Sequence, residues 1–341
     1  MEKMRILAVS ILSVIIAASV VFGATRAGVT PESNVTQLEN GAISGATAAM
    51  IMPDTAVSGL TLRYTYSGDK YNYVVAGMGA RNTGRGTISV KMPYPGTTVV
   101  NGYLYWTILD GTTPNSDNTK ITINGVKVTG TMIGSGPSPL WTPANGYTYR
   151  ATVTSLLWPT EGAGGVSYGL EIGGINTITT SAASPWNPTS TDARMAESVH
   201  LVIVFKDPSL AGPTTIHIYD GYYEQPGGMA TFVYNWPARA AGSARFSHLL
   251  ADGQEMFVPP FSKSVSFTQG ATTTTIDGAG ALNGNDPSIT SRATYQGSLS
   301  DTDTYNVGAL VAGAGGASTI TWQLSNDAIS WAALVFATGV D

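Results

Sequence analysis

Apolar and polar residues alternate with a period of two over most of the chain after about residue 58. The series begins with LTLRYTYSG (60–68), YNYVVAGMG (71–79), GTISVKMP (86–93) and TVVNGYLYWTIL (98–109). Because successive side chains of a strand point to opposite faces of a sheet, this alternation is typical of half-buried strands. Within KITINGVKVTGTMI (120–133), Asn124-Gly125 stands between two alternating runs and predicts a tight hairpin.

The same pattern continues toward the C-terminus, and helical periodicity is missing. Further strands are predicted over residues 149–158, 166–179, 198–207, 214–223 and 229–236, and in several shorter runs after residue 262. The best helix candidate, residues 238–253, is short and is interrupted by Gly242. Many short strands separated by turn residues predict an all-β fold, an antiparallel β-sandwich of the jelly-roll or Ig-like kind. A soft boundary near residues 238–262 leaves open two packed sandwich subdomains within the β-sandwich region, residues 58–341.

The first 23 residues have the organisation of a secretory signal peptide. MEKMR is a short positive region, residues 6–22 are almost entirely apolar, and Val21-Phe22-Gly23 provides a small-residue cleavage site. The alternative is an uncleaved membrane anchor, because the apolar run is close to the lower length limit for crossing a bilayer. We therefore expect a secreted or cell-surface protein with no membrane span after signal cleavage.

Composition narrows the possible functions. Charged residues make up only 11% of the chain, its formal net charge is −5, and it contains no cysteine. Without a basic patch to displace counterions from a phosphate backbone, nucleic-acid binding is not expected. The absence of cysteine excludes thiolate nucleophiles, cysteine-ligated zinc and iron–sulfur clusters.

Residues 24–57 are predicted to form a flexible N-terminal segment. They contain Pro31 and Pro53, and Asn34 begins a glycosylation-type sequon, Asn-Val-Thr. Within the segment, ISGATAAMIM (43–52) is apolar enough to act as a donor strand for another copy. Exposed sheet edges accept such strands, and this chain has few charges with which to block its edges. Self-association by strand exchange, or binding to other surface proteins, is the resulting hypothesis, and the alternative is that this segment packs on its own domain.

The stretch TTIHIYDGYYEQPGG (214–228) raises the question of a ligand site. Asp220 and Glu224 offer carboxylates, and the candidate aromatic contacts for a sugar ring are Tyr222, Tyr223, Trp186 and Trp236. Against this, Asp220-Gly221 is a strong turn pair that would simply end a strand. A glycosidase also needs a second carboxylate at a defined separation. We favour the strand-end interpretation and assign no catalytic residue.

No cofactor is predicted, and calcium is the one ion left open. The acidic segments 110–118, 283–287 and 300–306 supply hard oxygen ligands, and Asp301 and Asp303 are the best candidates. None of these segments matches a complete calcium-binding loop, and Asp and Asn are also common in ordinary turns. The three histidines have no local spacing typical of a metal site.

Four motifs in sequence order resemble an uncharacterised β-sandwich domain of bacterial and archaeal surface proteins. The motifs are Tyr103-Leu104-Tyr105-Trp106, Thr152-Val153-Thr154-Ser155-Leu156, Val202-Ile203-Val204-Phe205-Lys206-Asp207-Pro208 and Tyr219-Asp220-Gly221-Tyr222. They correspond to the family patterns AYLYW, DVTSLV, LVVVYEDP and LYDGF, and the resemblance covers roughly residues 60–310. It implies a β-sandwich at the cell surface and carries over no catalytic residue. The chain lacks the adhesin-like repeats and the sorting signal of longer members.

Two functional hypotheses follow. The first is a secreted or cell-surface structural or adhesive β-sandwich protein without catalytic activity, which self-assembles through strand exchange. The alternative is an extracellular carbohydrate-binding module or glycosidase, with glycans as ligands.

Overall fold

The computed structural model describes most of the chain after residue 58. The described residues are 35–37, 59–81, 83–92, 97–138, 145–157, 160–162, 165–175, 194–238, 242–253, 263–278, 282 and 300–340. The signal segment, Asn34, the proposed donor strand (43–52) and Trp186 lie outside them. Every strand pairing that is described is antiparallel, and the only helices among the described residues are two short 3-10 turns, Ser116–Thr119 and Thr154–Leu156. The prediction of an all-β antiparallel sandwich is confirmed.

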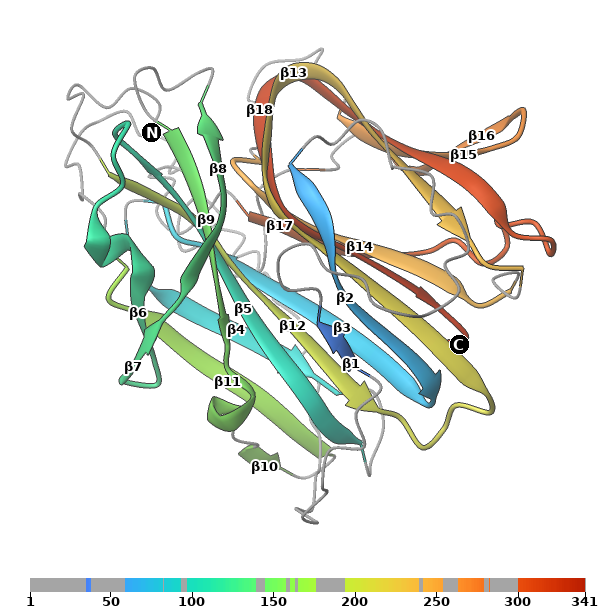
Figure 1. Ribbon diagram of the computed structural model, residues 1–341, viewed down its shortest axis with the longest axis horizontal. Helices are drawn as coiled ribbons and strands as arrows, with labels where there is room; N and C mark the ends of the chain where they lie inside the picture. The colour runs from blue at the N-terminus through green and yellow to red at the C-terminus, as the bar shows by residue number, and fades with distance from the viewer. Residues whose placement is uncertain are drawn as a thin grey trace, which may run out of the picture.

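Three sheets are stacked, and a central sheet lies between the other two (Figure 1). In spatial order the central sheet consists of β3 (Tyr71–Gly79), β12 (Met195–Lys206), β5 (Thr98–Asp110), β9 (Asn145–Thr152) and β8 (Thr131–Pro137). The small sheet consists of β10 (Thr160–Gly162), β11 (Gly165–Gly173), β6 (Lys120–Ile123) and β7 (Val126–Thr129), with β4 (Gly86–Lys91) paired to β11.

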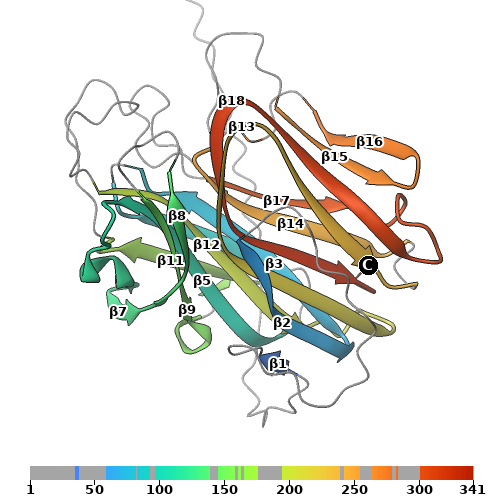
Figure 2. The same ribbon diagram turned by 45° about the horizontal axis from the view of Figure 1, so that its top comes forward.

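The large sheet covers the other face of the central sheet. Its main path is β1 (Val35–Gln37), β2 (Leu60–Asp69), β13 (Pro213–Trp236), β18 (Gly316–Thr338), β14 (Ala244–Ala251) and β17 (Ser300–Asn306). β15 (Ser264–Gln269) also pairs with β18, and β16 (Thr272–Asp277) pairs with β15. β13 and β18 are so long that they bend together and carry β15 and β16 back over the same sheet (Figure 2).

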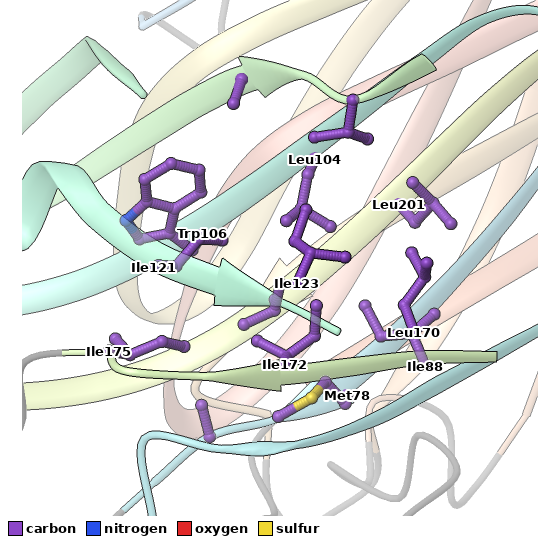
Figure 3. Close-up of a cluster of buried hydrophobic side chains, with 14 of the residues drawn as sticks. Met78, Ile88, Leu104, Trp106, Ile121, Ile123, Leu170, Ile172, Ile175 and Leu201 are labelled. Carbon is purple, nitrogen blue, oxygen red and sulfur yellow. The ribbon is translucent and has the colours of Figure 1, made fainter. Parts of the chain in front are cut away.

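The central sheet is buried on both faces, and its sequence explains this. Met195–Phe205 of β12 is buried at every position, and its alternate residues enter two different cores. Leu201 and Ile203 face the small sheet, where the first core also includes Leu104 and Trp106 of β5 (Figure 3). The indole Nε1 of Trp106 donates a hydrogen bond to the carbonyl oxygen of Asn118 at 2.8 Å, so its one polar atom is satisfied inside that core.

The second core lies between the central and large sheets and is rich in tyrosine. Tyr64 of β2 stacks on Tyr103 of β5 with ring centroids 4.3 Å apart, and the hydroxyl groups of Tyr66 and Tyr103 are hydrogen-bonded to each other. Tyrosine fits here because its ring fills the space between two sheets while its hydroxyl finds a polar partner. The two sheets are therefore joined by both apolar packing and buried hydrogen bonds.

A third core fills the bend of the large sheet and is rich in aromatic residues. The far half of β13 folds back so that Tyr234 stacks on Phe336 of β18, with ring centroids 4.0 Å apart. Trp236 and Phe232 pack against the same Phe336 ring. This core forms within one sheet that curls on itself, and most of its residues come from β13, β18 and β14, with Val265 and Phe267 of β15 and Leu60 of β2 also contributing.

The prediction that β13 ends at Asp220-Gly221 is wrong. The strand continues through this pair to Trp236, and the pairing with β18 shifts register between Asp220 and Tyr223, which marks a β-bulge. Gly221 has a φ of 156°, and a β-carbon there would overlap the carbonyl oxygen of Gly59. Glycine is required here because another part of the backbone approaches closely, and no turn is formed.

The hairpin predicted at Asn124-Gly125 is confirmed. These two residues connect β6 and β7 and have φ angles of 50° and 76°, as a type I′ turn requires. Within the weak helix candidate (238–253), residues Ala244–Ala251 form strand β14. Within residues 24–57 the structure describes only β1, whose Val35 and Gln37 pair with Tyr66 and Tyr64 at the edge of the large sheet.

Candidate functional site

Asp220 lies in a closed ion-pair network between the central and large sheets. Its side chain has no exposed surface, and it pairs with Arg150 of β9 and with Arg63 of β2, whose Nε is 3.5 Å from Oδ1. Tyr105 of β5 donates a hydrogen bond to Oδ2 at 3.2 Å. Burial raises the pKa of Asp220, while the positive charges of Arg150 and Arg63 oppose that rise. The described contacts of Asp220 join β13 of the large sheet to β5 and β9 of the central sheet, so its role there is to hold the two sheets together.

Tyr222, two residues further along β13, lies over glycines of the central sheet. A β-carbon on Gly146 of β9 would overlap the Tyr222 ring, and one on Gly134 of β8 would overlap the Tyr222 backbone. A β-carbon on Gly136 of β8 would stand 3.5 Å from the same ring. These glycines leave the space that the buried tyrosine occupies. The bend of β13 is thereby fixed against β8 and β9.

Glu224 follows on the same face of β13 and is half-buried. The hydroxyl of Tyr222 donates a hydrogen bond to Oε2, and the hydroxyl of Ser138, just after β8, donates one to Oε1 at 2.8 Å. Burial is the main cause that raises the pKa of Glu224 from 4.5 to about 7, and the negative charge of Asp252 adds to it. A carboxyl of this kind carries a proton for much of the time near neutral pH, so it can donate as well as accept hydrogen bonds.

Two further carboxyl groups, those of Glu197 and Asp252, lie at the same end of the sandwich and both accept hydrogen bonds from Arg81. Arg81 Nε donates to Glu197 Oε2 at 3.1 Å, and Arg81 Nη2 donates to Asp252 Oδ1 at 2.9 Å. Arg81 and Glu197 are almost fully buried, with side-chain exposures of 0% and 1%. Burial raises the pKa of Glu197 to about 8; Arg81 opposes the rise, whereas Asp252 and Glu224 add to it. We refer to Glu197, Glu224 and Asp252, with Arg81, as the carboxyl cluster.

Sequence reasoning found only one member of the carboxyl cluster, Glu224. Asp220 does not belong to it, and the other carboxyl groups come from the start of β12 and from just after β14. One signal was present for Glu197. It stands at the start of the apolar run MAESVHLVIVF, where a glutamate must be buried, and glutamate is rarely buried without a partner. Nothing local marks Arg81 or Asp252 as its partners.

The remaining candidate residues take structural positions where they are described. Trp236 is 3% exposed and lies in the third core, so it has no face available for a sugar ring. Tyr223 points away from the carboxyl cluster, packs against Trp331 with ring centroids 5.4 Å apart, and donates a hydrogen bond to Gln225 Oε1 at 2.6 Å. Of the proposed aromatic contacts, only Tyr222 lies beside Glu224.

The calcium candidates Asp301 and Asp303 lie two residues apart on β17. Asp303 Oδ2 is 3.1 Å from His248 Nε2, and His248 Nδ1 accepts a hydrogen bond from Trp322 Nε1 at 3.0 Å, so a neutral His248 has its proton on Nε2. In the parts of the chain that the structure describes, no three His, Asp or Glu side chains are grouped so that they could hold a metal ion. Calcium binding stays a prediction.

The other two histidines also have partners. His200 Nδ1 is 2.9 Å from the hydroxyl of Thr302, and His217 Nδ1 is 2.8 Å from the hydroxyl of Tyr234. None of the described residues forms a helix that is long and apolar enough to cross a membrane.

The fold and site define an all-β protein of stacked antiparallel sheets with a carboxyl cluster at one end. No protein-family model matches the chain, and no curated protein matches it. Among solved structures it is similar to PNGase F, a glycosylasparaginase from Flavobacterium meningosepticum, at 13% identity and a TM-score of 0.23, covering 79% of this chain and 96% of that chain. A structure of recombinant N-glycanase F aligns at 12% identity, with the same TM-score and coverage. Similarity this weak carries no argument about function.

Proposed function

We propose that this protein is a secreted or cell-surface structural or adhesive β-sandwich protein without catalytic activity. The packing of the central sheet is the main support. β12 and β5 are buried on both faces, and three cores occupy the space between and within the sheets. A chain with so much of its apolar surface buried in sheets is suited to remain folded without disulfides outside the cell.

The signal segment and the surface-protein resemblance support the same proposal. The resemblance rests on motifs that the structure places in β5, after β9, in β12 and in β13. All four motifs contribute core residues, Trp106, Val153, Val204 and Tyr219 among them, so the motifs are suited to preserving a fold.

Cell fractionation tests the localisation. The chain with its native N-terminus is expressed in a secreting host, and intact-mass analysis identifies its first residue. We expect a mature protein that begins at residue 24 in the extracellular or surface fraction. Retention in the cytoplasm with Met1 intact would contradict the proposal.

Catalysis is tested separately with a panel of polysaccharides and a reducing-end assay. We expect no release of reducing ends, because Asp220 is held in ion pairs and offers no exposed oxygen. Hydrolysis by the wild type that is lost in Asp220→Asn would overturn the non-catalytic proposal.

Strand exchange is the finer part of the proposal. The low share of charged residues with which to block sheet edges supports it, and the pairing of Val35–Gln37 with β2 of the same chain marks the edge of the large sheet as one that accepts a strand from the N-terminal segment. Light scattering compares the mature chain with a variant that lacks residues 24–57. Conversion of multimers into monomers is the expected result, and equal oligomeric states would end the donor-strand proposal.

A further inference from the structure

The carboxyl cluster is assembled at one end of the stacked sheets. Arg81 follows the end of β3, Glu197 stands at the start of β12, Asp252 follows the end of β14, and Ser138 follows the end of β8. Glu224 lies on β13 between two register shifts in its pairing with β18, one at Asp220–Tyr223 and the other at Pro226–Gly228. Five separate strands thus bring polar side chains to one place, and such strand-end positions are where β-sandwiches commonly carry their binding residues.

The cluster is close to electrically neutral when its two glutamates are protonated. Arg81 and Asp252 form an ion pair at 2.9 Å. Burial raises the pKa of Glu224 to about 7 and that of Glu197 to about 8, so both carboxyl groups are mostly protonated in slightly acidic solution and Glu224 is about half ionised at neutral pH. A cation would meet the charge of Arg81, and an anion would meet the carboxyl groups. The chemistry best matched to the cluster is a neutral ligand that both donates and accepts hydrogen bonds.

One oxygen in the cluster, Oε1 of Glu197, has no hydrogen-bond partner among the described residues. Glu197 Oε2 accepts from Arg81, whereas Oε1 is buried without such a bond. A buried polar atom without a partner costs free energy, so native structures usually provide a water molecule or a ligand.

Three further polar atoms on β12 and β17 also lack a described partner. The hydroxyls of Ser198 and Ser300 and the Nε2 atom of His200 are buried without described partners. Ser300 Oγ and His200 Nδ1 would stand 3.0 Å and 2.9 Å from a β-carbon on Gly77, so these two side chains are neighbours between β12 and β17. Burial lowers the pKa of His200 to about 3, which makes this polar region uncharged as well.

We propose that the carboxyl cluster is the polar part of a binding site for a neutral, hydroxyl-rich ligand, a saccharide, and that Glu224 is the carboxyl group that contacts it. Glu224 is half-buried, whereas Glu197, Arg81 and Asp252 are buried, so Glu224 is the member that solvent reaches. Tyr222 and Ser138 each bond one of its oxygens and hold it in position. Each oxygen keeps a second lone pair for a sugar hydroxyl.

This inference rests on the adhesive part of the proposed function, and it can fail separately. Binding is measured on the purified chain, so it does not depend on where the protein is found in the cell. A chain that is secreted but binds no saccharide would leave the structural role in place and would remove the binding site.

The experiment uses an array of cello-, xylo-, manno- and chito-oligosaccharides, followed by calorimetric titration with the best oligosaccharide. The wild type is compared with Glu224→Gln, with Tyr222→Phe, and with Glu171→Gln as a control, because Glu171 lies exposed on β11 of the small sheet. We expect Glu224→Gln to weaken binding by about tenfold, because the amide has one acceptor oxygen in place of the two that accept from Tyr222 and Ser138. Tyr222→Phe should weaken it severalfold, and Glu171→Gln should leave it unchanged.

Three results would overturn the proposal. The first is a wild-type chain that binds no oligosaccharide on the array. The second is a Glu224→Gln variant with the melting temperature and affinity of the wild type. The third is calcium binding to the wild type that Glu224→Gln abolishes while saccharide binding is absent, which would identify the cluster as a cation site.

Discussion

Replacement of Glu197 by glutamine should make the protein less sensitive to alkaline pH. In the folded protein, burial raises the pKa of Glu197 from 4.5 to about 8. Between these pH values the folded chain keeps a proton that the unfolded chain releases. The stabilisation from this proton is fully present below about pH 4.5 and is lost as the pH rises through 8, so the free energy of unfolding falls in that window.

The magnitude follows from the size of the shift. One pKa unit corresponds to about 1.4 kcal/mol, so the shift of Glu197 from 4.5 to about 8 amounts to roughly 5 kcal/mol between the two ends of the window. Glutamine has nearly the shape of a protonated glutamic acid and cannot lose a proton. Glu197→Gln should therefore match the wild type within about 1 kcal/mol at pH 5 and exceed it by several kcal/mol at pH 9.

Urea unfolding from pH 4.5 to pH 9 measures this difference directly. Comparison between variants cancels the groups that titrate alike in both proteins. Glu171→Gln, on the exposed face of β11, is the control and should follow the wild-type curve at every pH. If Glu197→Gln loses stability with pH as steeply as the wild type does, Glu197 is not the buried acid that the structure indicates.

Three further outcomes are expected. Gly146→Ala should lower the free energy of unfolding by about 1–3 kcal/mol, because its β-carbon would overlap the Tyr222 ring. The control Gly169→Ala has open space around its β-carbon and should cost less than half as much. Equal shifts in melting temperature for the two variants would contradict this packing argument. EDTA should barely change the melting temperature, and a loss of more than about 10 °C would indicate a structural calcium ion. Limited proteolysis should cut residues 24–57 first, and initial cleavage beyond residue 60 would contradict the predicted flexible segment.

The strands could be predicted from the sequence because their alternation is a local property. The core on each side of β12 follows from the same period of two, since Val199 and Leu201 enter one core and Val202 and Val204 enter the other. Hairpin residues such as Asn124-Gly125 are equally local, because the φ angles that a tight turn needs restrict the residue types at two adjacent positions.

The path of β13 could not be predicted in this way. Asp220-Gly221 has the composition of a turn, yet the glycine is required by the carbonyl oxygen of Gly59, a residue distant in sequence. The carboxyl cluster was equally hidden, since Arg81, Glu197 and Asp252 meet only after three different strands have been placed. Local patterns report strands and turns, whereas close approaches and charge partners depend on the complete fold.

Asp220 and Glu224 show how the surroundings of a carboxyl group decide its role. Both lie on the face of β13 that meets the central sheet. The partners of Asp220 include two arginines, whose charges compensate its own, and it has no exposed surface. Glu224 accepts hydrogen bonds only from hydroxyl groups in the described part of the chain, and it remains partly open to solvent. A compensated, closed carboxylate can stabilise a fold but cannot meet a ligand. An uncompensated carboxyl at the bend, near its pKa, retains the capacity to exchange its hydrogen bonds with one.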